Sequence, residues 1–228
     1  MSDIKAVLFD VDNTLVDFMR MKQISVEIAI DYMMSAGLPG TKEEIYSEIF
    51  NFYRQTHIES QKALEVVIEK RLGSVDRGIL AMGIIGYQRG RDMATYPYPK
   101  VEFTIKEILR MGLKVGVVSD APAEQCYNRL ARLNLIPWLD VVVTYDDTGE
   151  YKPSEKPFLL ALERLALSPR EVLYVGDWPQ KDIVGAKKVG LITVFARWGE
   201  HKDAPDTGAD YDLNSIDKIL DVIKKINS

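Results

Sequence analysis

The sequence is poor in the residues that build disulfide frameworks and zinc sites. Among its 228 residues there is one cysteine, Cys126, and there are two histidines, His57 and His201. A single cysteine excludes an intrachain disulfide framework and agrees with a reducing compartment. The two histidines share no metal-ligand spacing, so nothing supports a zinc hydrolase. We expect Cys126 to be a buried helix residue rather than a nucleophile.

Long apolar runs and blocks of like charge are also absent. No run reaches the roughly 18 apolar residues that a membrane-spanning helix needs. The net charge is −5 and no basic cluster stands out, so there is no footprint for nucleic acid. Met1–Lys5 lead directly into the first predicted strand, so we expect no signal peptide. We expect a cytoplasmic protein that binds neither nucleic acid nor membrane, and its oligomeric state stays open.

Residues 18–94 have no strand-like run and contain four segments with helical spacing. The second begins with the capping-box pattern Thr41–Glu44. The fourth, from about residue 76 to 93, has Gly83, Gly86 and Gly90 on one face. We expect another helix to pack against that bare face, and a ligand groove is the alternative. The spacing therefore predicts a small helical domain inserted at 18–94.

On either side of the insert, short apolar runs alternate with helical patterns. The chain is 46% hydrophobic and long enough for one domain or two small ones. The first run, 4–9, precedes the insert, and the prolines of Tyr96–Pro99 mark the return from it. Further strands are predicted at 113–118, 140–145, 171–175 and 191–195, and helices at 101–111, 122–134, 157–167, 182–189 and 215–226. The alternation predicts an α/β fold with a doubly wound, Rossmann-like parallel sheet, formed by residues 1–17 and 95–228.

Polar side chains follow several of these predicted strands. Asp10 and Asp12 follow the first strand, Ser119 the second and Asp177 the fourth, while Lys152 lies in the loop after the third. The carboxyl ends of parallel strands share one edge of the sheet, so we expect these side chains to converge. Taken alone, the segment after the first strand fits an Asx-capped turn equally well.

A cluster of this composition suits phosphoryl transfer. Several carboxylates form the hard oxygen environment that Mg²⁺ prefers. A carboxylate beside a cation and a lysine stays ionised and can attack phosphorus. A second carboxylate two residues away can protonate the leaving group and later deprotonate water. Lys152 supplies a compact positive charge, and the Ser119 hydroxyl can hold phosphate oxygens.

In this order, the motifs resemble those of the haloacid dehalogenase-like superfamily, and the resemblance covers essentially the whole chain. Asp10–Thr14 resembles the first motif and Ser119 the second. Lys152, followed by Pro153 and Phe158, is similar to the third, and Gly176–Asp182 to the GDxxxxD form of the fourth. The helical insert is similar to the family's C1-type cap, which closes over the site. Asn13 and Trp178 depart from the commonest pattern, and Trp178 either shapes the site mouth or packs over its loop.

The resemblance implies a role for each position. Asp10 would be the nucleophile and Asp12 the general acid/base, while Lys152 would orient Asp10 and neutralise the phosphoryl charge. Ser119 and the amide of Asp120 would bind the phosphate. Mg²⁺ would be held by Asp10, Asp12 through its backbone carbonyl, Asp177, and Asp182 directly or through water or Lys152. Thr14 would orient Asp12. For Thr14 and Asp182, a turn hydroxyl and a helix N-cap are nearly equal alternatives.

Asp12 also separates the branches of the superfamily. The dehalogenase and phosphonate-cleaving branches lack this second aspartate, so its presence implies an oxygen leaving group and favours a phosphomonoester phosphatase. A sugar phosphomutase with the same phosphoaspartate chemistry is the alternative. A receiver domain, which binds phosphate as a signal, is disfavoured by the insert, and a non-catalytic phosphate-binding protein would have little reason to keep the whole set.

The substrate class is the least constrained prediction. The modest insert favours a small phosphorylated metabolite over a phosphoprotein. Basic and acidic residues are equal in number across 18–94, so the net charge of this segment does not indicate a particular partner. Arg20, Lys22, Arg54 and Arg89 either reach the far end of a ligand or lie on a solvated face.

Overall fold

The computed structural model describes residues 3–60 and 62–228, which form two compact units. The α/β unit comprises the residues up to Asp17 together with Tyr96–Ser228, and the helical unit comprises Phe18–Thr95. The chain thus leaves the α/β unit once, after its first strand, and returns to it for the rest of its length.

The α/β unit is built on a six-stranded parallel sheet in the order β3-β2-β1-β4-β5-β6. The first strand lies in the middle, and Leu8 faces Gly116 on one neighbour and Tyr174 on the other. The chain moves outward from β1 in one direction and then, from β4, in the other. The strands are β1 (Ala6–Phe9), β2 (Lys114–Val118), β3 (Val141–Val143), β4 (Val172–Gly176), β5 (Ile192–Ala196) and β6 (Tyr211–Leu213). Ligands of such sheets bind at the carboxyl ends of the strands where the order reverses, which here is beside β1 and β4.

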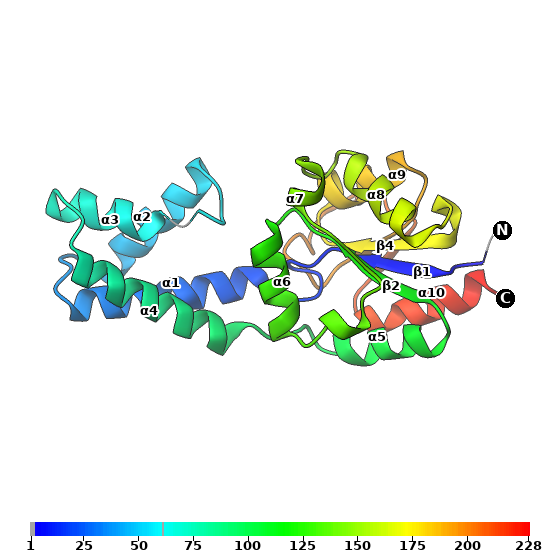
Figure 1. Cartoon of the computed structure of the whole chain (residues 1–228), viewed down its shortest axis with the longest axis horizontal. Helices are drawn as coiled ribbons and strands as arrows, with labels where there is room; N and C mark the ends of the chain where they lie inside the picture. The colour runs from blue at the N-terminus through cyan, green and yellow to red at the C-terminus, as the bar shows by residue number, and fades with distance from the viewer. Residues whose placement is uncertain (1–2, 61) are drawn as a thin grey trace. The chain divides into compact units, whose positions relative to one another are not determined.

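Helices cover both faces of this sheet. Figure 1 shows α5 and α10 on one face and α8 and α9 on the other. The helices are α5 (Val101–Arg110), α6 (Ala123–Arg132), α7 (Tyr145–Thr148), α8 (Lys156–Leu165), α9 (Val184–Lys188) and α10 (Ile219–Ile226). The predicted doubly wound, Rossmann-like fold is confirmed.

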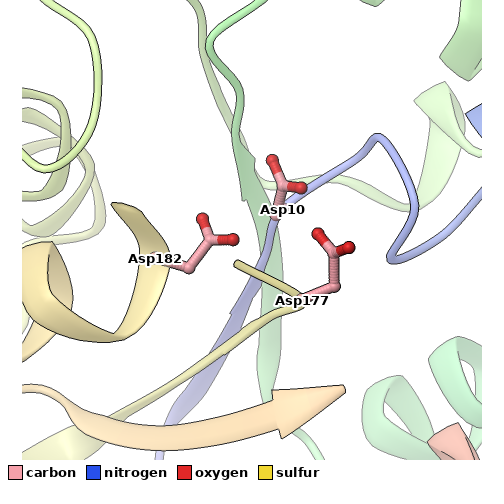
Figure 2. Close-up of side chains that lie close together, drawn as sticks. All are labelled: Asp10, Asp177 and Asp182. Carbon is pink, nitrogen blue, oxygen red and sulfur yellow. The ribbon is translucent and has the colours of Figure 1, made fainter. Parts of the chain in front are cut away.

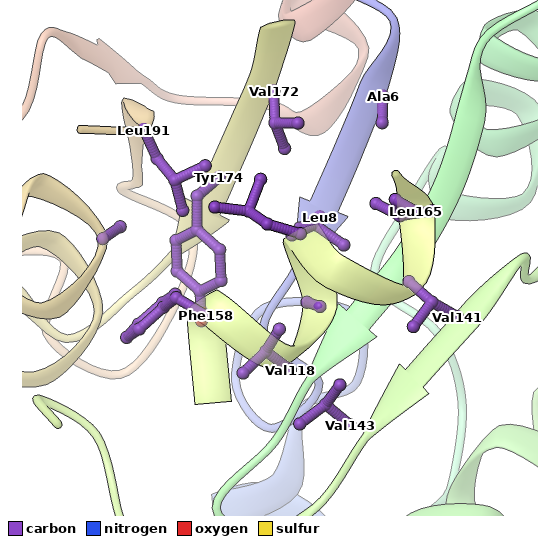
Figure 3. Close-up of a cluster of buried hydrophobic side chains, with 13 residues drawn as sticks. Ala6, Leu8, Val118, Val141, Val143, Phe158, Leu165, Val172, Tyr174 and Leu191 are labelled. Atoms are coloured by element: carbon purple, nitrogen blue, oxygen red, sulfur yellow. The ribbon is translucent and has the colours of Figure 1, made fainter. Parts of the chain in front are cut away.

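A cluster of buried hydrophobic side chains between the sheet and α8 supports the strands that lead to the site (Figure 3). Leu8 and Tyr174 from the sheet meet Phe158 from α8, and all three are fully buried. The Phe158 and Tyr174 rings meet edge to face with centroids 4.9 Å apart. This packing fixes the ring whose hydroxyl enters the site described below. Glycine is required at Gly116, because a Cβ there would lie 2.2 Å from Val141 Cγ1.

Several predicted boundaries are wrong for identifiable local reasons. The strand predicted to continue to Tyr145 ends at Val143, because Thr144 and Asp147 form a capping box that starts α7. The helix predicted to begin at Asp182 is preceded by a π-helical turn over Pro179–Ile183. The strand β6 and the four-residue α7 were not predicted, since elements this short carry little periodic signal.

The helical unit contains α1 (Phe18–Ser35), α2 (Lys42–Gln55), α3 (Ala63–Leu72) and α4 (Arg77–Ala94), and the capping box at Thr41 is formed. The glycine face of α4 packs against α1, as predicted. A Cβ on Gly86 would lie 2.8 Å from the carbonyl oxygen of Ile28, and one on Gly90 would lie 2.6 Å from Ser25 Cα. Across the described parts of the chain, no helix combines the length and apolar character that crossing a membrane requires.

Candidate active site

The loop after β1 is a tight turn that carries the first two acids. The amide of Asp10 donates to the carbonyl of Val175 on β4 at 2.8 Å, which continues the sheet by one residue. Asn13 then turns the chain with a φ of 59°, in the left-handed region that asparagine tolerates better than most residues with a side chain. Asn13, which departs from the family's commonest pattern, is thus a residue that suits the backbone conformation of this turn. Thr14 is fully buried, and its hydroxyl makes no hydrogen bond within residues 3–60 and 62–228.

Three buried carboxylates meet at the sheet edge. Asp10 follows β1, Asp177 follows β4 and Asp182 lies in the π-helical turn, and Figure 2 shows the three side chains converging. One carboxylate oxygen from each lies within 4.8 Å of the others. Oxygen ligands in a group this compact fit a hard divalent cation such as Mg²⁺, which binds through a few carboxylates and keeps several waters.

Lys152 ties the cluster together. Its ammonium lies 2.6 Å from Asp10 Oδ1 and 2.6 Å from Asp182 Oδ1, and it also donates to the Val118 carbonyl at 3.3 Å. The side chain is only 3% exposed, so these contacts replace water almost completely. Burial alone would lower the pKa of Lys152, but the two carboxylates outweigh it and hold the pKa well above its ordinary value. Lys152 is therefore a permanent positive charge at the end of β2.

The carboxylates outnumber that charge. Burial raises the pKa of Asp10 well above its ordinary value, and Asp182, Asp177 and Asp12 raise it further, while Lys152 opposes the shift. Three carboxylates around one ammonium leave an excess of negative charge in a buried space. A divalent cation is the natural counter-charge, because it would stabilise the ionised form of Asp10 where burial disfavours it.

Asp182 is held by more donors than the other two acids. Its Oδ1 accepts from Lys152 and, at 2.9 Å, from the Tyr174 hydroxyl, and its Oδ2 accepts from the amide of Trp178 at 3.0 Å. Glycine at Gly176 makes room for it, because a Cβ there would lie 2.4 Å from Asp182 Cγ. Asp182 lies inside the π-helical turn rather than at a helix N-cap, which excludes that alternative for it.

A loop after β5, which we call the 198–201 loop, contacts the carboxylate of Asp177. The amide of Glu200 donates to Asp177 Oδ2 at 2.8 Å, and His201 Nδ1 lies 3.5 Å from the same oxygen. The hydrogen bond with Asp177 raises the pKa of His201 above its ordinary value. A Cβ on Gly199 would lie 2.3 Å from Asp177 Cβ, so only glycine fits. Sequence reasoning missed this loop, because it has no motif and no candidate site residue was identified after the strand predicted at 191–195.

Aromatic residues near Asp177 make further contacts that hold the 198–201 loop in place. The indole of Trp178 stacks on the His201 ring with centroids 4.4 Å apart, and the Lys181 ammonium lies 4.4 Å from the indole centre. The Nε1 of Trp198 donates to the carbonyl of Thr14 at 2.9 Å. Trp178 thus packs over its loop, and the 198–201 loop joins the segments that follow β1 and β4.

The side chains after β2 have structural partners. Ser119 Oγ accepts from the amide of Ala121 at 3.1 Å. The Asp120 carboxylate accepts from the amide of Lys152 at 2.8 Å and pairs with Lys181 at 3.2 Å. Asp120 therefore anchors the lysine loop through its side chain. Its backbone amide and the Ser119 hydroxyl keep their predicted phosphate-binding role as a prediction.

Asp12 is paired with an arginine that sequence reasoning did not single out. Arg129 Nη1 lies 2.7 Å from Asp12 Oδ2. Arg129 lies on α6 and is buried together with Cys126 and Leu130. The helical spacing of these three was a weak signal that Arg129 faces inward. The burial of Cys126 confirms the prediction for that residue, and it raises the pKa of the thiol to about 12.

The sheet order and the acid–lysine cluster at its switch point define an α/β protein whose clustered carboxylates, beside a buried lysine, could hold a cation. The family model described as haloacid dehalogenase-like hydrolase matches residues 7–196, and the chain belongs to this family.

Proteins similar to the chain along most of its length include named phosphatases. A glyceraldehyde 3-phosphate phosphatase of Methanocaldococcus jannaschii is 34% identical over 98% of this chain and 98% of its own length. A phosphoglycolate phosphatase of Aquifex aeolicus is 30% identical over 86% of this chain and 85% of its own. The crystal structure of a HAD phosphatase from Thermococcus onnurineus matches with a TM-score of 0.72 at 24% identity, over 99% of this chain and 100% of that one.

Proposed function

We propose that the protein is a Mg²⁺-dependent phosphatase that hydrolyses a small phosphomonoester through an aspartyl-phosphate on Asp10. The observation that carries this proposal is the position of Lys152, whose ammonium bridges Asp10 and Asp182 at 2.6 Å each beside the third acid, Asp177. A carboxylate held in this way is oriented and its negative charge is compensated, which are the requirements for attack on an anionic ester.

Asp10 is the proposed nucleophile. The ammonium of Lys152 binds Oδ1 of Asp10, so we assign Oδ2 as the oxygen that forms the bond to phosphorus while the bond from phosphorus to the ester oxygen breaks. Asp12, two residues further along the turn, donates the proton that the leaving oxygen requires. In the second half of the reaction Asp12 takes a proton from water, which attacks phosphorus and releases Asp10 and inorganic phosphate.

Asp10 and Asp177 are the proposed carboxylate ligands of Mg²⁺, with the backbone carbonyl of Asp12, and Asp182 acts through its hold on Lys152. The three hydrogen bonds that Asp182 already accepts support this division. When bound, the ion supplies positive charge that stabilises the transferring phosphoryl group. The 198–201 loop fixes Oδ2 of Asp177, which prepares the carboxylate for a single orientation.

The substrate that we propose is a short-chain alkyl phosphate of two or three carbons. This rests on the relatives named glyceraldehyde 3-phosphate phosphatase and phosphoglycolate phosphatase, each of which covers most of this chain. Such esters have alkoxide leaving groups that depart poorly without a proton donor, which fits a second carboxylate at position 12. We propose that the helical unit, Phe18–Thr95, acts as the cap that selects the substrate.

Phosphate release from glyceraldehyde 3-phosphate, phosphoglycolate, sugar phosphates and p-nitrophenyl phosphate tests the proposal. We expect turnover of short alkyl phosphates that requires Mg²⁺ and stops in EDTA. Asp10→Asn should abolish it, whereas Asp146→Asn, an exposed aspartate at the start of α7, is the matched control and should retain it. Absence of turnover for every ester in Mg²⁺ would refute the phosphatase, and conversion of a sugar phosphate to its isomer without phosphate release would identify a mutase instead.

A further inference from the structure

Arg129 is a buried arginine on α6, and its burial requires an explanation. It lies on the inward face of α6 with Cys126 and Leu130, three and one residues away, and it is 6% exposed. Arginine is almost never buried unless it is paired, because its charge cannot be removed by deprotonation. The pairing partner is Oδ2 of Asp12, at 2.7 Å, and the side chain of Asp12 remains 24% exposed.

In this ion pair the guanidinium of Arg129 is buried, whereas the carboxylate of Asp12 is partly exposed. A guanidinium is planar and rigid, so a hydrogen bond from it constrains the plane and rotamer of the carboxylate that accepts it. Asp12 lies in the turn that follows β1. The guanidinium of Arg129 supplies that constraint from α6, an element that carries none of the proposed catalytic groups.

We propose that Arg129 is the positioning residue of the acid/base carboxylate, and that it is required for the departure of poor leaving groups. This inference rests on the proposed function, because it assigns a role to Asp12 in the hydrolysis of phosphomonoesters. Arg129 holds Asp12 Oδ2, and the carboxylate is thereby directed towards the ester oxygen rather than free to rotate. Binding of the phosphate itself and attack by Asp10 do not depend on this contact.

The leaving group distinguishes this role from a general structural one. An alkyl phosphate needs a proton on its leaving oxygen, whereas p-nitrophenolate departs as a stable anion. The ratio kcat/KM reports only the steps up to the release of the alcohol or phenol, so slower hydrolysis of the aspartyl-phosphate does not obscure it. In Arg129→Met, which keeps an apolar stem, we expect kcat/KM for the best alkyl phosphate to fall about 100-fold, the lower end of the usual general-acid contribution. For p-nitrophenyl phosphate it should fall only a few-fold.

Three further variants complete the experiment. Arg129→Lys keeps the charge and should recover part of the alkyl phosphate activity. Arg132→Met changes another arginine of α6, one turn further on and partly exposed, and should behave like the wild type. In an Asp12→Asn background, Arg129→Met should cause little further loss, because the two residues act through one group.

Equal losses for both esters in Arg129→Met, or no loss for either, would overturn the inference. So would an additional large loss in the Asp12→Asn background, because Arg129 would then act independently of Asp12. A wild-type protein that hydrolyses neither ester would overturn the proposed function and this inference together, whereas an active wild type with a uniform effect in the variants overturns only the inference.

Discussion

Replacing Lys152 by methionine gives a direct test of the charge balance in the site. Methionine has a similar length and no charge, so Asp10 and Asp182 keep their burial, with side chains 9% and 2% exposed, and lose the ammonium 2.6 Å away. Removing one partner of a buried ion pair typically costs about 3–5 kcal/mol of unfolding free energy. We expect a loss in that range at about pH 8 with EDTA present.

The loss should depend on pH in a definite direction. Without the ammonium, burial and the neighbouring carboxylates keep the pKa of Asp10 in the folded state above the unfolded value of about 3.9. A group of this kind binds its proton more tightly in the folded state, so stability is highest at low pH and falls as pH rises through the folded pKa. We therefore expect the deficit of Lys152→Met to grow between about pH 5 and pH 8, by at most about 1.4 kcal/mol per pH unit for each proton.

Urea denaturation followed by tryptophan fluorescence measures this deficit in the relevant unit. The three tryptophans, Trp138, Trp178 and Trp198, all lie in the α/β unit, so the signal reports its unfolding without contribution from the helical unit. Lys156→Met is the control, because Lys156 is 64% exposed in its pair with Glu150 and should lose less than about 1 kcal/mol. A deficit below about 1 kcal/mol for Lys152→Met, or one that does not change with pH, would refute the charge argument.

Three further changes have expected outcomes. Gly199→Ala places a methyl group against Asp177 and should raise the Mg²⁺ concentration for half-maximal turnover by about 10-fold or more. The circular dichroism spectrum of the variant should match that of the wild type. Cys126, with a pKa of about 12, should resist a thiol reagent at about pH 8 in the native protein and react in urea, and rapid native labelling would contradict its burial. Gly90→Ala gains about 1 kcal/mol of helix propensity but forces a Cβ to within 2.6 Å of Ser25 Cα, so thermal denaturation should show a net destabilisation of about 1–2 kcal/mol, and a stabilised variant would contradict the close packing of α1 and α4.

The sequence carries the parts of the fold that depend on local pattern. Buried parallel strands read as continuous apolar runs, and their ends bring the polar residues to one edge whatever the intervening sequence is. This reasoning placed Asp10 and Asp177 at the same edge of the sheet, and the structure has both in one carboxylate cluster. The glycine face of α4 was interpretable for the same reason, because a helix repeats every 3.6 residues.

The contacts that escaped prediction are those made through space by residues without a local signature. Arg129 reaches Asp12 across 117 positions of sequence, and nothing near either residue encodes the pairing. The 198–201 loop binds Asp177 through a backbone amide, which every residue except proline carries. Tyr174 was predicted only as a residue of a buried strand. Its ring does lie in the core, but its hydroxyl extends to Asp182.

The position of β1 has a consequence for the order in which the protein is assembled during translation. This strand is translated before its two neighbours in the sheet, since Leu8 pairs with Gly116 and Tyr174, which are synthesised much later. The helical unit, by contrast, is one uninterrupted segment, Phe18–Thr95, whose contacts are all available once its last helix has emerged. We therefore expect the helical unit to be complete while β1 still lacks both neighbours, and β1 to keep one edge unpaired after β2 is made and until β4 is made. Asp10 is thus translated well before Lys152, Asp177 and Asp182, the residues that surround it in the folded protein.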